Sequence, residues 1–442
     1  MRHARSSRRG ACPVLVIAIL AAAALFLPVG APAAEGPIKI GVLNDLTGPF
    51  AAAGSLPGHK GTMIAIDMVN EKGGVLGKVK IQPVEADSQS KPDVAINEAE
   101  RLLNVEKVDM LLGIYSSAIA VPLAEKVDKQ KRVLWITIAV ADGVLKGRHL
   151  QYVFRPQVNS GLYGEFSVRF IADQAPSQLK MKPADVRAAI IYEDGPYGTG
   201  IATSNEAEIK KQGMKLVLKE GYSASAPDLS SLITKLKAAR PDVIFHTGYN
   251  PDITLFFRQG KELGLRTKAI IGHGAGYAQI DKLREAFRDD VDYVYNIDPV
   301  ASQLLDGKKL KPGLGATRDE FLARYRKMTG ADQIPAHASM GFNHAWILLT
   351  DVLPRAIQKY GGWDADAVRK AALEVDIPDG GTIQGYGVKF APPEHELAGQ
   401  NLRTWPVAMQ YIGGKIQVVY PASIATAAPV LPLPASSPYA AR

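Results

Sequence analysis

Cysteine is almost absent from this chain of 442 residues, which contains Cys12 and no other cysteine. The sequence after position 34 has none, so disulfides, thiolate metal sites and cysteine nucleophiles are excluded for that part of the chain. Cys12 also precedes the N-terminal apolar run, whereas a lipid-anchoring cysteine would follow it. The fold must therefore be stabilised without covalent cross-links.

The sequence also lacks an apolar run of the roughly 20 residues that a membrane span requires. The nearest candidate is Val14 to Leu27, which follows four arginines and precedes Ala31-Pro32-Ala33-Ala34. Charged, apolar and small-residue segments in this order are typical of a cleaved secretory signal. We predict that residues 1–34 are a signal peptide and that the remainder is a soluble protein exported to the periplasm.

A strong excess of one charge is missing as well. The 52 Lys and Arg residues exceed the 44 Asp and Glu residues by 8, and removing four signal-peptide arginines leaves 48 against 44, or +4. Acidic and basic residues are interspersed, and no basic stripe with interleaved aromatics occurs. Nucleic-acid binding proteins usually carry such a stripe, so we expect no nucleic-acid partner.

Signatures of catalysis are missing too. Neither a G-x-S-x-G nor an H-E-x-x-H motif occurs. The stretch Gly272 to Gly276 has two of the three spaced glycines of a dinucleotide-binding loop, but Tyr277 occupies the third position. His337 and His344 are seven residues apart without an adjacent acid, which favours packing over metal binding. We predict that the protein is not an enzyme and has no cofactor or metal.

Apolar strand-like runs alternate with helical patterns through the first 250 residues, which predicts parallel sheets flanked by helices. Expected strands are residues 38–43, 79–84, 108–112, 133–136, 186–192, 216–222 and 243–246, and expected helices are 61–70, 93–106, 118–130, 162–174, 201–212 and 229–239. Pro92-Asp93 and Pro227-Asp228 each open a helix that leads to a strand. This repeated sequence pattern suggests two similar lobes.

The C-terminal part shows long helical patterns followed by short strands. Expected helices are 317–328, 339–360 and 365–374, and expected strands are 387–390, 407–412 and 416–419. We assign residues 35–155 and about 297–376 to lobe 1, and residues 156–296 and about 377–420 to lobe 2. Residues 421–442 are rich in Pro and Ala, and we expect them to form a disordered tail.

Four segments together resemble one family. They are Ile38 to Phe50 (IKIGVLNDLTGPF), Asn70 to Gly77 (NEKGGVLG), Tyr192 to Gly200 (YEDGPYGTG) and Arg258 to Leu265 (RQGKELGL). In this order, after a signal peptide, they resemble the periplasmic leucine/isoleucine/valine-binding family of ABC transporter receptors. The resemblance implies an α/β fold of two Rossmann-like lobes with parallel sheets, joined by three crossovers, that closes on a small solute.

The loops after two matching strands, Gly113 to Ser117 and Thr247 to Asn250, are expected to face each other across a cleft, because ligands bind beyond strand carboxyl ends. Ser116 and Ser117 begin a helix, where free backbone amides and two hydroxyls suit a ligand carboxylate. The alternative is that one serine merely caps the helix. The resemblance places the ligand carboxylate at this turn and so favours binding by Ser117.

The resemblance also implies ligand contacts after the strand 133–136, where the usual hydroxyl residue corresponds to Ala141. Ala139, Ala141 and Asp142 are therefore expected to contact the ligand through backbone groups. Tyr197 matches a family tyrosine that covers the ligand from lobe 2, although a turn-packing role is the alternative. In the opposing loop we expect either Tyr249 or Asn250 to contact the ligand.

His273 stands where amino-acid-binding relatives usually carry an acid for the ligand ammonium. A histidine cannot replace that anion, because burying an ammonium without a counter-charge costs several kcal/mol. The sequence therefore favours an acidic or amide-like solute, such as an aromatic carboxylate, with His273 donating a hydrogen bond. The alternative is a structural histidine in a loop.

These observations predict a monomeric periplasmic receptor that captures a small carboxylate-bearing or amide-like solute and delivers it to an inner-membrane ABC permease. Two other functions remain open. One is a ligand sensor for a signalling or amide-responsive regulator, which would use the same fold with a different partner. The other is an exported hydrolase that uses carboxylates such as Glu193 and Asp194, although exposed turns explain these residues better.

Overall fold

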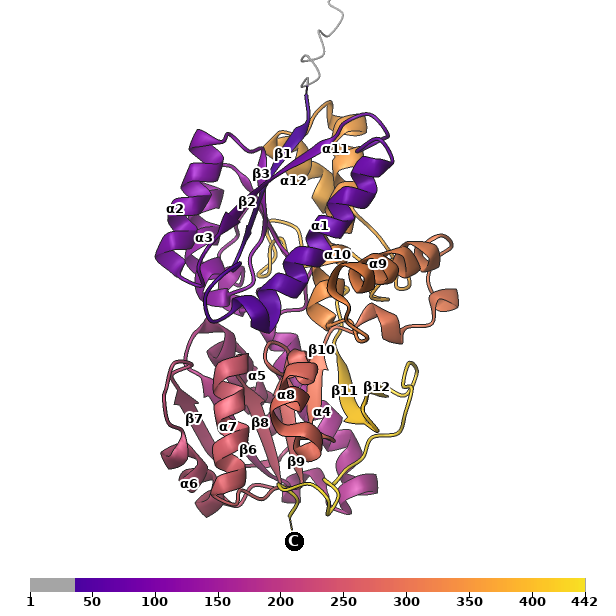
Figure 1. Ribbon diagram of the computed structural model, residues 1–442. Coiled ribbons are helices and arrows are strands. Elements are labelled where there is room, and N and C mark those ends of the chain that lie inside the picture. The colour runs from indigo at the N-terminus through magenta and orange to yellow at the C-terminus, as the bar shows by residue number, and fades with distance from the viewer. Residues whose placement is uncertain (1–35, 442) are drawn as a thin grey trace, which may run out of the picture.

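The predicted strands assemble into two sheets in a computed structural model that describes residues 36–441. Each sheet carries helices on both faces, and the two resulting α/β lobes lie one above the other (Figure 1). The predicted fold class is confirmed, and the proposed signal peptide lies outside the described residues. Within residues 36–441, no helix has the length and apolar character needed to cross a membrane.

The sheet of lobe 1 is parallel throughout and has the order β2-β1-β3-β4-β5. Its strands are β1 (Ile38–Asn44), β2 (Ile81–Asp87), β3 (Met110–Gly113), β4 (Val133–Ile136) and β5 (Val153–Phe154). Its helices are α1 (Leu56–Glu71), α2 (Pro92–Glu100), α3 (Ser117–Lys129), α9 (Leu314–Thr329), α10 (Ala336–Ile347), α11 (Leu353–Tyr360) and α12 (Ala365–Leu373). Central strands β3 and β4 are completely buried, as expected for a sheet covered on both faces.

The sheet of lobe 2 has the order β12-β11-β10-β9-β8-β6-β7, and its two antiparallel pairs are β10–β11 and β11–β12. Its strands are β6 (Arg187–Glu193), β7 (Lys215–Tyr222), β8 (Val243–Thr247), β9 (Ala269–His273), β10 (Tyr295–Asp298), β11 (Val407–Ile412) and β12 (Lys415–Tyr420). Its helices are α4 (Ser160–Gln174), α5 (Pro196–Lys211), α6 (Ser230–Ala239), α7 (Asn250–Glu262) and α8 (Ile280–Phe287).

Glycines allow α1 and α10 to cross at very short range in lobe 1. A Cβ atom at Gly61 would lie 2.1 Å from the Ala338 carbonyl oxygen, and one at Gly341 would lie 1.9 Å from the Gly58 carbonyl oxygen. Real side chains cannot occupy such positions, so these glycines set the distance between the helices. The crossing matters for the site, because α10 begins at the cleft and carries His337 into it.

The chain passes between the lobes three times, after β5, after β10 and before β11. Two of these crossovers lie side by side. The Arg155 amide donates to the Gly399 carbonyl at 2.9 Å, and the Asn401 amide donates to the Arg155 carbonyl at 2.9 Å. The three-crossover hinge that the family resemblance implies is therefore present.

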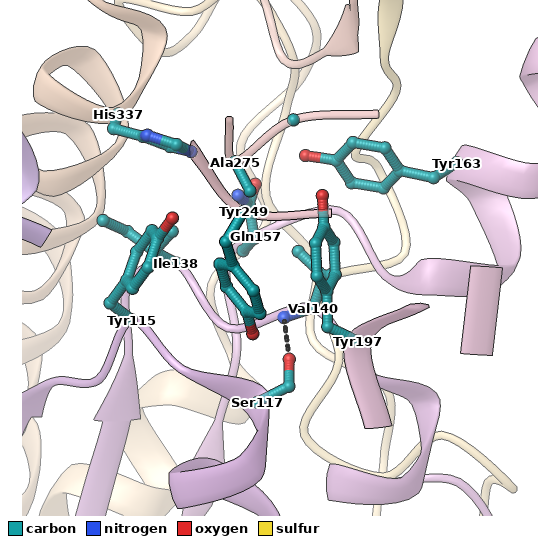
Figure 2. Close-up of a pocket in the computed structure, with 11 residues that line it drawn as sticks. Tyr115, Ser117, Ile138, Val140, Gln157, Tyr163, Tyr197, Tyr249, Ala275 and His337 are labelled. Carbon is teal, nitrogen blue, oxygen red and sulfur yellow. Dashed lines mark hydrogen bonds between the residues drawn. The ribbon is translucent and has the colours of Figure 1, made fainter. Parts of the chain in front are cut away.

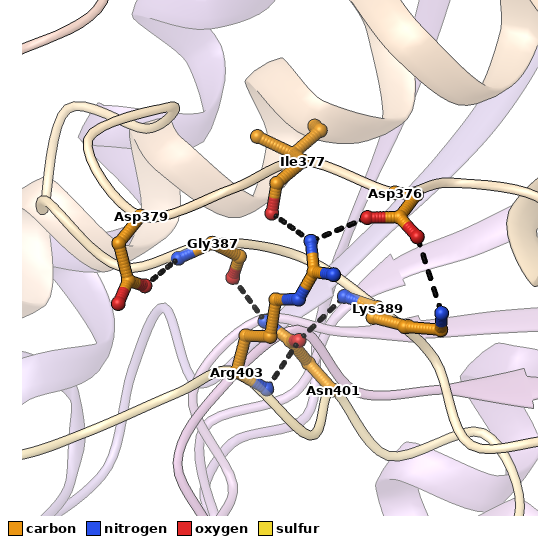
Figure 3. A network of polar contacts seen from close by, with 7 residues as sticks. All are labelled: Asp376, Ile377, Asp379, Gly387, Lys389, Asn401 and Arg403. Carbon is orange, nitrogen blue, oxygen red and sulfur yellow. Dashed lines mark hydrogen bonds and ion pairs between the residues drawn. The ribbon is translucent and has the colours of Figure 1, made fainter.

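Residues 377–404 pack on lobe 1, not on lobe 2 as the sequence suggested. Ile383, Val388 and Phe390 belong to the lobe 1 core. The expected strand 387–390 forms only single bridges, because side chains take over much of its backbone bonding. The Asn401 side chain accepts from the Lys389 amide and donates to the Gly387 carbonyl, within a network that also joins Arg403 to Asp376 (Figure 3).

The C-terminal segment is ordered, so the prediction of a disordered tail is wrong for residues 421–441. This segment runs along lobe 2 to its far end (Figure 1). Tyr439 is completely buried, and its hydroxyl donates to the Phe257 carbonyl at 2.8 Å. Ala440 bridges Thr267 in parallel, and the Leu433 amide donates to the Lys268 carbonyl. A prediction from composition could not identify these contacts. A few buried side chains are enough to order a Pro-rich segment.

We predict that Tyr439→Ala lowers the free energy of unfolding by about 3–5 kcal/mol, because a large buried ring is removed. Tyr439→Phe should cost only about 1 kcal/mol, because it removes a single hydrogen bond. Urea unfolding measures both values. Ser436→Ala, at an exposed position of the same segment, is the control. Equal stability of Tyr439→Ala and the parent protein would show that the segment is not anchored.

Candidate binding site

A pocket lies between the lobes, where the carboxyl ends of both sheets meet. It is lined by Tyr115, Ser117, Ile138, Val140, Gln157, Tyr163, Tyr197, Tyr249, Gly274, Ala275 and His337 (Figure 2). The cavity volume is about 20 Å³, far below the roughly 300–1,000 Å³ usual for small-molecule sites, so the wall side chains nearly fill the pocket in this conformation. A solute can enter only if these side chains or the two lobes move apart.

Both lobes contribute walls to this pocket. Tyr115 follows β3, and Ile138 and Val140 follow β4, while Tyr249 follows β8 and Ala275 follows β9. These are the positions beyond strand carboxyl ends at which open α/β sheets bind ligands. The structure thus brings together the two loops that the sequence placed across one cleft.

Aromatic rings hold the lobes against each other around the pocket. Phe50 of lobe 1 stacks on Tyr249 of lobe 2 with ring centroids 4.2 Å apart. Tyr115 of lobe 1 also lies against Tyr249, with ring centroids 6.2 Å apart. Within the lobes, Tyr249 lies beside Tyr197 at 5.3 Å, and Tyr115 meets His337 edge to face at 5.5 Å. Such pairs contribute about 0.5–1.5 kcal/mol each beyond area burial. The described conformation is therefore a closed one.

The pocket wall carries no charged side chain. None of its eleven lining residues is Lys, Arg, Asp or Glu. Burial raises the pKa of Tyr115, Tyr163, Tyr197 and Tyr249 well above the ordinary tyrosine value, so all four phenols remain protonated. Burial also lowers the pKa of His337 to about 4, so its ring is neutral at pH 7. Recognition must rely on apolar contact and hydrogen bonds.

Hydrogen-bond donors collect where α3 begins. The first amides of a helix have no partner within the helix, and the helix dipole favours negative charge there. The Ser117 Oγ accepts from the amides of Val140 and Ala141 at 3.3 and 3.2 Å, which leaves its proton free to donate. The Ser116 Oγ is buried without a hydrogen-bond partner. The Tyr249 hydroxyl points toward Ser117 (Figure 2).

Three of the nine predicted contact residues line the pocket, namely Ser117, Tyr197 and Tyr249. Ser116 immediately precedes α3 and is buried beside it. Asn250 begins α7 and is not on the wall, so of the two candidates in this loop the structure places Tyr249 there. The Tyr249 amide donates to Asp252 at 2.9 Å, which fixes the loop that presents the ring.

Ala139, Ala141 and Asp142 are not on the wall, and their polar groups bond elsewhere in the protein. The Ala139 amide donates to the Ile114 carbonyl at 3.1 Å. The Ala141 carbonyl accepts from the Arg155 guanidinium at 2.7 Å. The Asp142 carboxylate accepts from the Ser160 hydroxyl and the Gly161 amide at the start of α4. Their neighbours Ile138 and Val140 face the pocket instead.

His273 is completely buried and is not on the pocket wall. Burial lowers its pKa to about 3, so the ring is neutral. Its Nδ1 lies 3.2 Å from the His246 carbonyl, to which it can donate, and 2.9 Å from the Thr247 hydroxyl, from which it can accept, while Nε2 has no partner among the described residues. The contribution of His273 is its backbone carbonyl, which accepts from the Tyr197 hydroxyl at 2.5 Å.

Several wall residues were not predicted as ligand contacts, and His337 was assigned to packing. Tyr115 directly precedes Ser116-Ser117 in a loop already assigned to the cleft, so the loop itself was a sufficient signal. Gln157, Tyr163 and His337 come from the first crossover and from the starts of helices that begin at the hinge. Their roles depend on how three crossovers meet, which no local pattern encodes.

Two α/β lobes around an enclosed pocket define a two-lobed solute-binding protein. A family model described as periplasmic binding protein matches residues 37–404, and the chain belongs to that family. The chain is also 33% identical to Leu/Ile/Val-binding protein homolog 7 of Brucella suis biovar 1 over 403 residues, covering 91% of this chain and 96% of the relative. The predicted family resemblance is confirmed.

Solved structures show the same fold at lower identity. The branched-chain amino acid substrate-binding protein LivJ of Streptococcus pneumoniae, in complex with isoleucine, has a TM-score of 0.69 and 20% identity, covering 86% of this chain and 97% of that one. A solute-binding protein of R. palustris in complex with benzoate has a TM-score of 0.67 and 16% identity, covering 86% and 95%. One fold thus accommodates an amino acid and an aromatic acid.

Asp298 at the end of β10 predicts a specific pH dependence of stability. Burial raises its pKa from 3.8 to about 7, so the folded protein keeps a proton that the unfolded chain releases above about pH 4. The free energy of unfolding therefore falls as pH rises from about 4 to about 7. Asparagine does not titrate, so the Asp298→Asn variant lacks this decrease. Between pH 4 and pH 8 its free energy of unfolding should therefore rise by up to about 4 kcal/mol relative to that of the parent.

Urea unfolding of variant and parent at both pH values measures this difference. Buried histidines such as His246 and His344, with pKa values lowered to about 3, act in the opposite direction in both proteins and cancel in the comparison. Asp194→Asn replaces an exposed carboxylate with the same amide and serves as control. Parallel profiles for Asp298→Asn and the parent would show that Asp298 is not protonated in the fold.

Proposed function

We propose that this protein is the periplasmic receptor of an ABC importer and binds a small carboxylate with an apolar or aromatic body. The observation that carries the proposal is an uncharged pocket with four tyrosines, bordered by the N-terminus of α3. The carboxylate lies at Ser116 and Ser117, where amides and hydroxyls donate to it. Tyr115, Tyr249 and Ile138 surround the remainder of the solute.

The proposal includes closure and delivery. The solute binds the closed form preferentially, because both lobes contact it, and so shifts the population toward closure. An inner-membrane permease then recognises the closed receptor. The family supports a periplasmic location after removal of residues 1–34. Large exposed apolar side chains are scattered over separate elements of the described chain, which supports a monomer: Leu76, Val105, Leu263, Met328 and Leu402.

A thermal-shift screen identifies the solute class, because a ligand stabilises the folded state by mass action. The panel contains leucine, isoleucine, benzoate, benzamide and urea. We expect a carboxylate from this panel to raise the melting temperature. Stabilisation by benzamide or urea but by no carboxylate would contradict the proposed class. Co-purification with a permease tests delivery, and a solute-dependent complex with a regulator in its place would overturn that part.

We predict that Ser116→Ala weakens binding of the best carboxylate about 10- to 100-fold, the equivalent of one charge-assisted hydrogen bond. The ligand-free protein should keep its stability, because the Ser116 Oγ has no partner to lose. Titration calorimetry measures the affinity. Ser117→Ala should weaken binding as well, and Ser177→Ala, at an exposed position of lobe 2, is the control. Unchanged affinity in both pocket variants would refute the carboxylate position.

A further inference from the structure

Two pocket tyrosines have already committed their hydroxyl protons. The Tyr163 hydroxyl donates to Asp298 Oδ1 at 2.5 Å, and the Tyr197 hydroxyl donates to the His273 carbonyl at 2.5 Å. A phenol has a single proton, so Tyr197 cannot donate a second hydrogen bond, and neither can Tyr163 when Asp298 is ionised, above its raised pKa of about 7. Toward the pocket, both oxygens can then only accept.

These oxygens converge with a third one beside Gly274. A Cβ atom built on Gly274 would lie 3.4 Å from Asp298 Oδ1 and 3.5 Å from each of the two phenol oxygens. Glycine leaves that point empty, and its φ of +38° is one that other residues rarely adopt. Gly274 itself lines the pocket. We call Tyr163, Tyr197, Gly274 and Asp298 the acceptor corner.

The acceptor corner holds unused capacity for hydrogen bonds. Asp298 is completely buried, and its Oδ2 has no partner among the described residues. When Asp298 is ionised, above its raised pKa of about 7, this oxygen can only accept. Leaving such an oxygen unpaired costs about 1–3 kcal/mol, which a donor brought in by a ligand would recover.

The acceptor corner and the carboxylate end lie on opposite sides of the pocket. Figure 2 shows the hydroxyls of Tyr163 and Tyr197 close together, and Ser117 beyond the other end of the Tyr197 ring. The pocket is therefore polarised, with donors at α3, acceptors at the far end and rings between them. In an α-amino acid the ammonium and the carboxylate share one carbon, so that ligand cannot reach both ends with its charged groups.

We propose that the solute carries a hydrogen-bond donor, a hydroxyl or amino group, at the end remote from its carboxylate, and that the acceptor corner recognises it. A para-substituted aromatic carboxylate has this form. The inference rests on the proposed function, because that function places the carboxylate at Ser116 and Ser117. Tyr163 and Tyr197 then determine specificity, since a site built to bond a donor group rejects analogues that lack it.

Calorimetry with three benzoates of similar size tests the inference at about pH 8, where Asp298 is ionised. We expect 4-hydroxybenzoate, 4-aminobenzoate or both to bind at least tenfold more tightly than 4-fluorobenzoate, which has no donor. Comparing the affinities of 4-hydroxybenzoate and 4-aminobenzoate shows whether the acceptor corner prefers a hydroxyl or an amino group. Tyr163→Phe should bring the ratio of affinities for donor and fluoro ligands close to one. A variant that merely folded less well would weaken all three ligands and leave the ratio unchanged.

Matched variants complete the test. Tyr152→Phe removes a phenol that also bonds a carboxylate, Asp366, but at an exposed site outside the pocket, and should leave the ratio unchanged. Tyr197→Phe provides a second pocket variant if Tyr163→Phe does not fold. If all three benzoates bind with equal affinity and Ser116→Ala abolishes that binding, the acceptor corner is overturned but the proposed function is kept. Binding of leucine alone would also overturn the inference, and binding of no carboxylate would overturn both.

Discussion

The buried guanidinium of Arg155 connects the hinge to the pocket, and the arrangement of the site depends on it. Its Nε donates to Gln400 at 2.6 Å and its Nη1 to the Ala141 carbonyl at 2.7 Å. Burial lowers its pKa only to about 10, so the group stays charged at neutral pH and retains strong donors. Since Val140 precedes Ala141, this contact fixes one pocket wall to two crossovers. The hinge and the lobe 1 wall therefore form one rigid unit against which lobe 2 can close.

Much of the architecture was predictable from local patterns. The strand 133–136 matches β4, and the expected helix 118–130 nearly coincides with α3, because buried apolar runs and caps are local signals. Errors arose where long-range contacts decide structure. Asn401 replaces strand bonding near Lys389, and Tyr439 anchors a Pro-rich segment that composition marks as disordered. The expected helix 339–360, in contrast, is helical from Ala336 to Tyr360, with a π-helical turn at Leu348–Val352 just before Pro354.

The site was predictable where a loop follows a strand and harder to predict where helices converge. Ser117 and Tyr249 could be assigned because the carboxyl ends of parallel strands define the cleft. Tyr163 and Asp298 could not, because they are 135 residues apart in the sequence and meet only at the hinge. His273 was selected for its side chain, and the structure adds a role for its backbone carbonyl, which accepts from the Tyr197 hydroxyl.

Closure of the lobes around a solute is the central claim, and a distance across the cleft tests it most directly. Helices α3 and α5 approach each other from the two lobes, and Glu125 and Thr203 are exposed positions on them. Spin labels at Glu125→Cys and Thr203→Cys report their separation by pulsed electron paramagnetic resonance. Closure predicts a shorter, narrower distance distribution when a stabilising carboxylate is added. An identical distribution with and without that solute would contradict a receptor that closes on its ligand.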